Sequence, residues 1–314
     1  MNKKLLGNLS MFTSKFISGI NANALKYLLP LWIAPLTCIT IRFTFGAIAF
    51  IIISQFFKKE PLITIKQKLI IFLFGAVGVY GAMSTYLIGL RYTTPVSCTI
   101  ILALIPIWVF ILSMVIYKEK ITSKKGIGLF LGLTGAVISI FMKKDPHYAE
   151  DPLLGDIFII ICSIFNAINF IINKNLVKKI GVYTILKWSF MGAAFSAVVV
   201  SLFIKWEAPI FHEPLHLFPL AVLLFILIFP TIISYLLIKI GLKYITPTAG
   251  AMYNYVTLIV ATIVALIVGQ DKFQWIMMIS ISLLCVGIFL VEEDINKECA
   301  SPNKEYDDKF KHIL

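Results

Sequence analysis

Long apolar runs separated by short polar breaks make up almost the whole chain. A helix needs about 20 mostly apolar residues to cross a bilayer, because each residue rises about 1.5 Å through roughly 30 Å of hydrocarbon. About ten runs meet this length, at residues 9–29, 33–57, 69–90, 96–117, 126–142, 153–172, 183–204, 217–238, 249–268 and 273–291. The breaks are rich in proline, glycine and charged residues. The pattern predicts an all-α membrane protein with ten transmembrane helices, in which short connections make neighbouring helices antiparallel.

The chain also contains an internal repeat. The segment GLRYTTP at Gly89–Pro95 returns as GLKYITP at Gly241–Pro247, an offset of 152 residues that also pairs Glu119 with Asp271. Each half holds five runs, an odd number, so the second half must cross the membrane upside down relative to the first. The sequence therefore predicts two inverted five-helix repeats, which can rock so that one central site opens alternately to each side. A duplicated scaffold without a passage is the alternative. The predicted units are residues 1–148, 149–293 and a polar cytoplasmic tail, 294–314.

Composition supports a lipid environment. The chain is 59% hydrophobic and 14% charged, against roughly 45–50% and roughly 25% in soluble domains. Its formal net charge of +12 comes from lysines at the ends of apolar runs, and only Arg42 and Arg91 are arginines. This arrangement does not form a nucleic-acid surface. We expect membrane lipid and a small-molecule substrate as partners, and no nucleic acid.

The lysines predict an orientation, because cytoplasmic loops are enriched in lysine and arginine. One set of alternate loops holds roughly 15 of them, namely Lys3, Lys4, Lys58, Lys59, Lys66, Lys68, Lys118, Lys120, Lys124, Lys125, Lys174, Lys178, Lys179, Lys239 and Lys243. The other set holds roughly half a dozen, namely Lys26, Arg91, Lys143, Lys144, Lys205 and Lys272. Both termini are therefore predicted to be cytoplasmic, in a cell membrane that is the inner one in bacteria.

Motifs for catalysis or ATP use give no support for an enzyme. Residues His212 to His216 read HEPLH, the letters of a zinc-protease motif. However, Pro214 lies in the middle of the helix that this motif requires. The cysteines have no metal-type spacing, and no phosphate-binding loop is present. We expect no cofactor, no metal and no ATP-driven step. A membrane scaffold or assembly subunit is the main alternative to a permease, and a membrane enzyme is the more distant one.

The run from Gly89 to Thr122 resembles the end of an EamA repeat in the drug/metabolite transporter superfamily. In that family the repeat ends with a small-residue, Tyr and Pro turn, a proline in the next helix, here Pro106, and a glutamate at its exit, here Glu119. The resemblance implies a permease for a small polar metabolite or drug-like solute, without indicating which. The second half departs from the pattern, because Leu258 stands opposite Pro106 and Asp271 opposite Glu119. The two halves are therefore not expected to contribute equally to gating.

Polar residues deep in the runs are the candidate binding residues, because each costs free energy in hydrocarbon unless it faces protein or water. Cys162, Asn166, Asn169 and Asn173 recur at helical spacing and form one stripe. Such stripes either line a cavity or join helices through hydrogen bonds. The predicted substrate-binding residues are Asn21, Asn166, Asn169, Tyr253, Asn254, Ser84 and Tyr235. Asn166 and Asn169 are predicted to line the central pathway.

Charged and kinked positions complete the candidate set. Arg42 lies well inside the second run, either as an anchor for an anionic or zwitterionic substrate or as a helix-packing residue paired with carbonyls. Lys26 is expected to snorkel to the outer boundary. Pro106 and Pro230 are expected to bend their helices. The predicted gating or structural residues are Pro106, Pro230, Glu119, Asp271 and Arg42. No Asp or Glu lies at a run's centre, so the substrate is expected to be neutral, zwitterionic or anionic.

Overall fold

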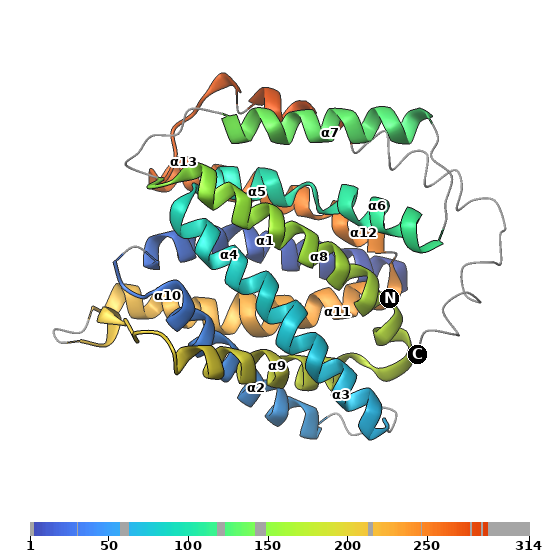
Figure 1. Cartoon of the computed structure of the whole chain (residues 1–314), viewed down its shortest axis with the longest axis vertical. Helices are drawn as coiled ribbons and strands as arrows, with labels where there is room; N and C mark the ends of the chain where they lie inside the picture. The colour runs from blue at the N-terminus through green and yellow to red at the C-terminus, as the bar shows by residue number, and fades with distance from the viewer. Residues whose placement is uncertain are drawn as a thin grey trace.

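The structure is a computed structural model of the chain. It describes residues 3–29, 31–56, 63–117, 123–141, 149–212, 216–245, 247–276, 278–283 and 285–287. The described part is built from helices, with no strand (Figure 1). The helices are α1 (Lys3–Leu28), α2 (Pro35–Phe56), α3 (Ile65–Phe74), α4 (Tyr80–Tyr92), α5 (Pro95–Leu102), α6 (Ile105–Tyr117), α7 (Ser123–Phe141), α8 (Pro152–Ile180), α9 (Val182–Ser201), α10 (Leu217–Ile228), α11 (Tyr235–Tyr244), α12 (Pro247–Met252) and α13 (Asn254–Val268). Three short turns, η1 (Gly75–Val79), η2 (Pro209–Phe211) and η3 (Phe229–Ser234), lie between them.

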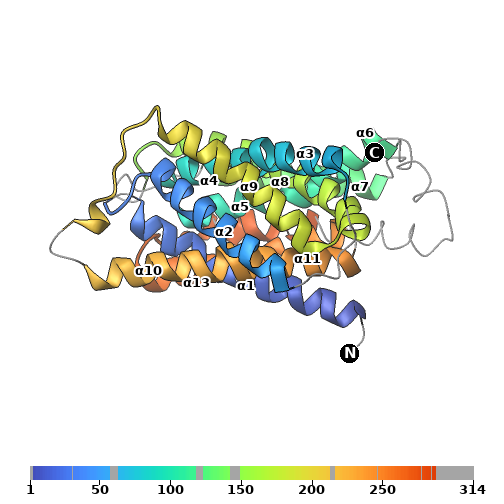
Figure 2. The ribbon, with the colours of Figure 1, turned by 90° about the horizontal axis from the view of Figure 1, so that it is seen from below.

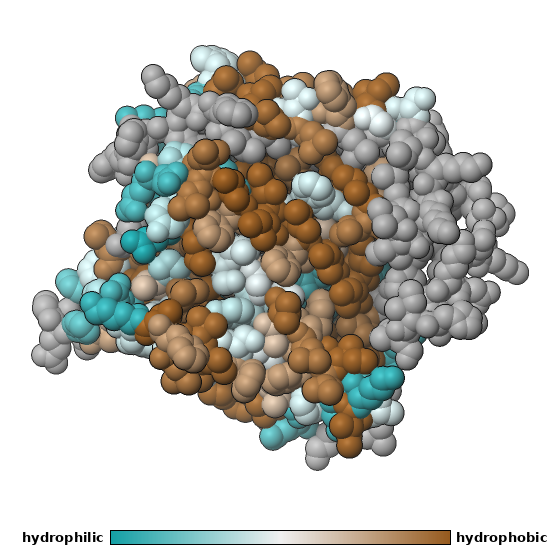
Figure 3. All heavy atoms as spheres, viewed as in Figure 1, coloured by the Kyte–Doolittle hydropathy of each residue, from teal (hydrophilic) through white to brown (hydrophobic). Residues whose placement is uncertain are grey.

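The helices have the length and surface of membrane spans. Within the described residues, 7 helices are long and apolar enough to cross a bilayer, and two shorter apolar helices lie at 126–135 and 278–287. Large apolar side chains such as Phe56, Val77 and Phe195 are exposed along these helices. Figure 3 shows apolar residues over most of one face, with hydrophilic residues gathered towards its edges. The predicted all-helical membrane protein is confirmed at this level.

Four glycines let two pairs of helices cross closely. Gly7 on α1 lies against Gly241 on α11, where an added Cβ at position 241 would be 3.3 Å from the Gly7 carbonyl oxygen. Gly155 on α8 lies against Gly89 on α4, where an added Cβ would be 2.8 Å from the Gly89 oxygen. Small residues of this kind allow membrane helices to approach backbone to backbone. These crossings bring α1, α4, α8 and α11 around the centre of the bundle.

The two crossings occupy matching sequence positions. Gly89 and Gly241 are related by the offset of 152 residues. Gly7 and Gly155 are 148 residues apart, and the same offset aligns Leu5-Leu6 with Leu153-Leu154 and Asn21 with Asn169. The first helix of each half therefore makes the same type of contact with the third helix of the other half.

Helix irregularities also recur in the two halves. The turn η1 interrupts the span 65–92 and the turn η3 interrupts the span 217–244, both as π-helical turns. They include Gly78 and Pro230, which are related by the offset of 152. Both positions therefore lie in local departures from α-helical hydrogen bonding. The α5–α6 run is broken before Pro106. The α12–α13 run is broken at Tyr253, although Leu258 stands at the position that corresponds to Pro106 and no proline lies near it. Residue Glu119 lies outside the described residues.

A peripheral layer is formed by α7 and the helical segments after residue 275 (Figure 1). An added Cβ at Gly287 would lie 2.6 Å from the Gly128 oxygen and 2.6 Å from the Gly132 nitrogen. These two glycines are spaced four residues apart on α7, as in the close-packing motif of membrane helices. In this chain that motif is therefore used for packing within one molecule.

Candidate substrate cavity

A small cavity lies at the centre of the bundle. Figure 2 shows α1, α10, α11 and α13 on one side and α3, α4, α8 and α9 on the other. The cavity, about 70 Å³ in volume, lies between residues of both sets. Its lining residues are Lys15, Val79, Ala82, Asn166, Asn169, Phe170, Asn173, Tyr235, Ile238, Lys239 and Leu242. Asn166, Asn169 and Tyr235, which were predicted to bind substrate, all line it.

The asparagine stripe of α8 supplies hydrogen-bonding groups to this cavity. The Asn169 Nδ2 group donates to the Gly78 carbonyl in η1 at 3.3 Å, and the Asn173 Nδ2 group donates to the Asn169 carbonyl at 2.6 Å. The Asn166 Nδ2 group donates to the Cys162 carbonyl at 3.0 Å. The Oδ1 atoms of Asn169 and Asn173 are buried and have no hydrogen-bond partner among the described residues. The stripe thus presents two unused acceptors at a buried surface.

Lys15 reaches the cavity from α1 and is held by a residue at the α12–α13 break. Its Nζ atom donates to the Asn254 Oδ1 atom at 2.8 Å and lies 5.3 Å from the centre of the Phe170 ring. The Asn254 Nδ2 group donates in turn to the Ala251 carbonyl at 2.8 Å. Asn254 does not line the cavity, but it orients a residue that does.

Lys239 lines the same cavity from α11, one helical turn after Tyr235. Only 5% of the residue is exposed, and its Nζ atom has no hydrogen-bond partner within the described part of the chain. Sequence reasoning counted Lys239 as a loop residue because the apolar run was predicted to end at residue 238. The helix continues to Tyr244, so this interpretation was wrong. Lys15 was missed because a single lysine inside an apolar run gave no distinct pattern.

Other polar residues join helices or bond within them. The Ser14 and Ser234 hydroxyls lie 2.6 Å apart and link α1 to η3. The Ser84 hydroxyl donates to the Gly81 carbonyl of its own helix at 3.1 Å. Asn21 is buried and its Oδ1 atom has no hydrogen-bond partner among the described residues, while Tyr253 lies at the break before α13. Ser84, Asn21 and Tyr253 are not among the lining residues.

Arg42 is buried and is not among the residues that line the cavity. Its Nε atom donates to the Thr231 hydroxyl at 3.1 Å, and its Nη1 atom lies 3.6 Å from the Met83 sulfur. Thr231 lies in η3 and donates to the Ile226 carbonyl at 2.7 Å. In this structure the Arg42 side chain therefore links α2 to the π turn η3.

Lys26 does not extend to solvent as expected. It is buried, and its Nζ atom donates to the carbonyls of Leu90, Arg91 and Thr93 at 3.1, 2.9 and 2.7 Å. The carbonyls at a helix end have no partner within the helix, so a nearby ammonium satisfies them without reaching water. The Thr93 hydroxyl donates to the buried Asp156 carboxylate at 2.7 Å. Asp271, another predicted structural residue, follows α13 and accepts from the Lys272 backbone amide at 2.8 Å.

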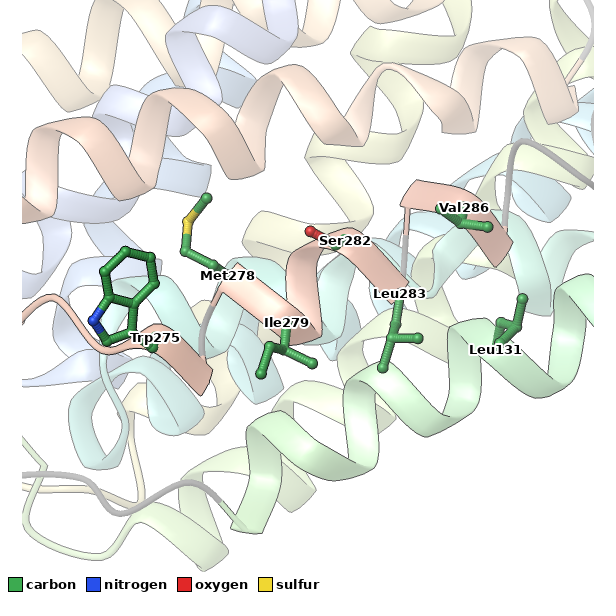
Figure 4. A pocket seen from close by; sticks show the side chains of 7 residues that line it. All are labelled: Leu131, Trp275, Met278, Ile279, Ser282, Leu283 and Val286. Atoms are coloured by element: carbon green, nitrogen blue, oxygen red, sulfur yellow. The ribbon is translucent and has the colours of Figure 1, made fainter.

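A larger pocket, about 400 Å³, lies between α7 and the segment after Trp275 (Figure 4). Apart from Ser282 its lining is apolar: Leu131, Trp275, Met278, Ile279, Leu283 and Val286. Large side chains around it, such as Trp275 and Val286, are exposed on the outside of the bundle. Its chemistry suits acyl chains of lipid better than a polar solute, so the smaller central cavity is the candidate site.

The zinc-protease letters do not form a zinc site in the described residues. His212 and His216 both have extended backbone conformations, whereas the motif needs them one turn apart on a helix. The ring of His216 packs against Trp32 at 4.6 Å between centroids. The described residues contain no group of three His, Cys, Asp or Glu side chains that could hold a metal ion.

Comparison with known proteins shows the family. The EamA-like transporter family matches residues 5–141 and, separately, residues 153–292. The chain belongs to the EamA-like transporter family. The resemblance seen in the sequence is confirmed, and this EamA-like protein is a membrane transporter. Its membership accounts for the helical fold and for the similarity between its halves.

Curated relatives of this EamA-like transporter are transporters as well. The uncharacterized transporter YyaM of Bacillus subtilis is 25% identical over 269 residues, 84% of this chain and 85% of that protein. The S-adenosylmethionine uptake transporter of Rickettsia bellii is 28% identical over 230 residues, 73% of this chain and 74% of that protein. A solved crystal structure superposes with a TM-score of 0.64 at 16% identity, over 93% of this chain and 98% of that chain. This last likeness shows a shared fold.

Proposed function

We propose that this transporter moves a small polar solute across a cell membrane by alternating access, and that the central cavity is its substrate site. The observation that carries the proposal is the pair of buried, unused acceptors on Asn169 and Asn173, two residues that line the cavity. A buried acceptor without a partner costs about 1–3 kcal/mol. A solute that donates hydrogen bonds to these oxygens recovers that cost, which favours binding at this position.

The proposed architecture is ten spans in two inverted five-helix repeats. Two separate family matches, the paired glycine crossings and the paired π turns support it. In Figure 1, α1 and α8 run in opposite directions, as the first helices of inverted repeats must. We infer that both termini are cytoplasmic, from the predicted excess of loop lysines on that side.

The volume of the cavity implies a second conformation. Sites for drug-sized ligands occupy about 300–1,000 Å³, whereas this cavity holds about 70 Å³. A whole metabolite therefore needs the surrounding helices to separate. The π turns are suited to that movement, because π turns at functional sites locally relax the helical hydrogen-bond ladder. The bond from Asn169 to Gly78 connects the cavity wall directly to one of these turns.

Transport is proposed to be secondary or passive, since the sequence has no phosphate-binding loop. The name of the Rickettsia relative makes S-adenosylmethionine one candidate solute. Its sulfonium group is cationic, however, and the cavity is lined by two lysines and by no carboxylate. A neutral, zwitterionic or anionic solute fits this lining better.

Identification of the solute tests the proposal. Purified protein is screened by thermal unfolding against a metabolite library that includes S-adenosylmethionine, because a ligand of the folded state raises its apparent stability. Each stabilising compound is then offered to vesicles that contain the protein and to vesicles without it. Saturable uptake that requires the protein supports transport. If compounds bind to the protein but vesicles take up none of them, the result favours the alternative of a membrane scaffold without transport.

A further inference from the structure

The two lysines at the central cavity have no acidic partner in the described structure. Lys15 is 8% exposed and Lys239 is 5% exposed. The Lys15 ammonium group contacts the neutral amide of Asn254 and the ring of Phe170. The Lys239 ammonium group has no hydrogen-bond partner among the described residues. Charged side chains inside a membrane protein are costly and normally pair with one another or face a functional cavity.

We propose that Lys15 and Lys239 form an anion-binding subsite, so that the transported solute carries a carboxylate or phosphate group that enters between them. This inference rests on the proposed function and adds the substrate class to it. The two side chains approach the same cavity from α1 and α11. An oxyanion in the cavity supplies the missing counter-charge to both.

The size of the cavity agrees with this assignment. Its volume is about 70 Å³, well below the roughly 300–1,000 Å³ of sites that hold a drug-sized ligand. This space accepts a carboxylate or phosphate group but not the remainder of a metabolite. The rest of the solute extends toward the acceptors of Asn169 and Asn173 when the helices separate.

Neither lysine of the cavity has a lysine at the related position of the other half. The offset of 148 residues places Ser163 opposite Lys15, and the offset of 152 places Leu87 opposite Lys239. Neither lysine therefore arises from a general feature of the repeat. Lys26 and Lys174, by contrast, are matched and bind backbone carbonyls. The unmatched pair is the pair at the cavity.

Thermal unfolding of the purified full chain tests the subsite with simple probes. Sodium acetate, succinate and phosphate are compared with acetamide and succinamide, at one ionic strength set with sodium chloride. The expected result is a saturable rise in the unfolding midpoint with at least one of the three anions, and none with the amides. Phosphate without acetate or succinate identifies the group as phosphate, and the reverse identifies it as carboxylate.

Two variants assign any such effect to the lysines. Lys239→Met is expected to weaken anion binding by at least about tenfold, while the ligand-free protein stays folded because the Lys239 ammonium makes no hydrogen bond there. Lys243→Met is the matched control, because Lys243 is an exposed lysine one turn further along α11. Lys15→Met is expected to lose binding as well. Absence of any anion effect, or an undiminished effect in Lys239→Met, overturns the subsite.

Failure of the subsite is distinguishable from failure of the proposed function. If vesicles take up a solute equally well with the native chain and with Lys239→Met, transport stands and the anion subsite is wrong. If the native chain binds anions in a Lys239-dependent way but vesicles take up no solute, the subsite stands and transport through the cavity is wrong.

Discussion

Lys26 and Lys174 lie 148 residues apart in the sequence, and each donates its ammonium group to backbone carbonyls at the end of the third span of its own half. Lys26 bonds to the Leu90 and Thr93 oxygens, and Lys174 bonds to the Leu242 and Ile245 oxygens. These acceptors are themselves related by the offset of 152. A cation at the end of a helix satisfies its orphan carbonyls and interacts favourably with the helix dipole.

This relationship predicts that both lysines stabilise the fold. Lys26→Met and Lys174→Met are each expected to lower the free energy of unfolding by about 1–3 kcal/mol, because buried carbonyls lose their donor. Chemical unfolding in detergent measures this loss. Lys66→Met is the control, since Lys66 is exposed at the start of α3. Equal stability of all three variants would contradict the capping role.

The glycine crossings predict a second stability effect. Gly155→Ala is expected to cost about 1–3 kcal/mol, because overpacking a tight contact shifts the backbone, and the added Cβ meets the Gly89 oxygen at 2.8 Å. Gly126→Ala is the matched control, since an added Cβ at Gly126 on α7 meets nothing within 4 Å. The control is expected to unfold at or above the native midpoint. A similar midpoint for both variants would show that the α4–α8 crossing is not tight.

The loop lysines predict the orientation. In a cysteine-free background, a cysteine at Thr122 is expected to be shielded from an impermeant maleimide added to intact cells, because its loop is predicted to be cytoplasmic. A cysteine at His212 is expected to react. Labelling after permeabilisation controls for reactivity at each position. Reaction of position 122 in intact cells would reverse the proposed topology.

The asparagine stripe predicts a separation of transport from stability. Asn166→Leu and Asn169→Leu are expected to raise the transport constant of the solute in vesicles by at least about tenfold, because a site built to hydrogen-bond a substrate discriminates strongly when a partner is removed. Loss of a helix-joining bond alone costs about 0.6 kcal/mol on average. Thr134→Val is the control, because Thr134 on α7 bonds only within its own helix. A normal transport constant together with lowered stability would place the stripe in packing.

The sequence predicted the all-helical membrane fold and, among the residues that line the cavity, Asn166, Asn169, Asn173 and Tyr235. The asparagine stripe was visible because its residues recur at spacings of one helical turn. The two lysines were not, since Lys239 follows an apolar run and Lys15 interrupts one. The match between Lys26 and Lys174 was hidden as well. An ungapped offset of 152 pairs Lys26 with Lys178. Lys26 pairs with Lys174 only when the first helices of the two halves are aligned at their own offset of 148, four residues less than the offset of the third helices.

The break in the α12–α13 run could not be predicted from its sequence. Its counterpart before Pro106 has a clear cause in the missing amide of proline. At Tyr253 no proline is present, and the break is instead accompanied by the bonds of Asn254 to Ala251 and to Lys15. That contact joins residues 239 positions apart in the chain. Such tertiary contacts override local propensity, so single-sequence patterns do not reveal them.

Substrate protection at Asn169 tests the central claim most directly. Asn169→Cys in a cysteine-free background is alkylated with a small maleimide, with and without the solute that the vesicle assay identifies. The account predicts that saturating solute slows alkylation at position 169 and leaves the rate at Thr134→Cys on α7 unchanged. An unchanged rate at position 169 with saturating solute would contradict the assignment of this cavity as the transport site.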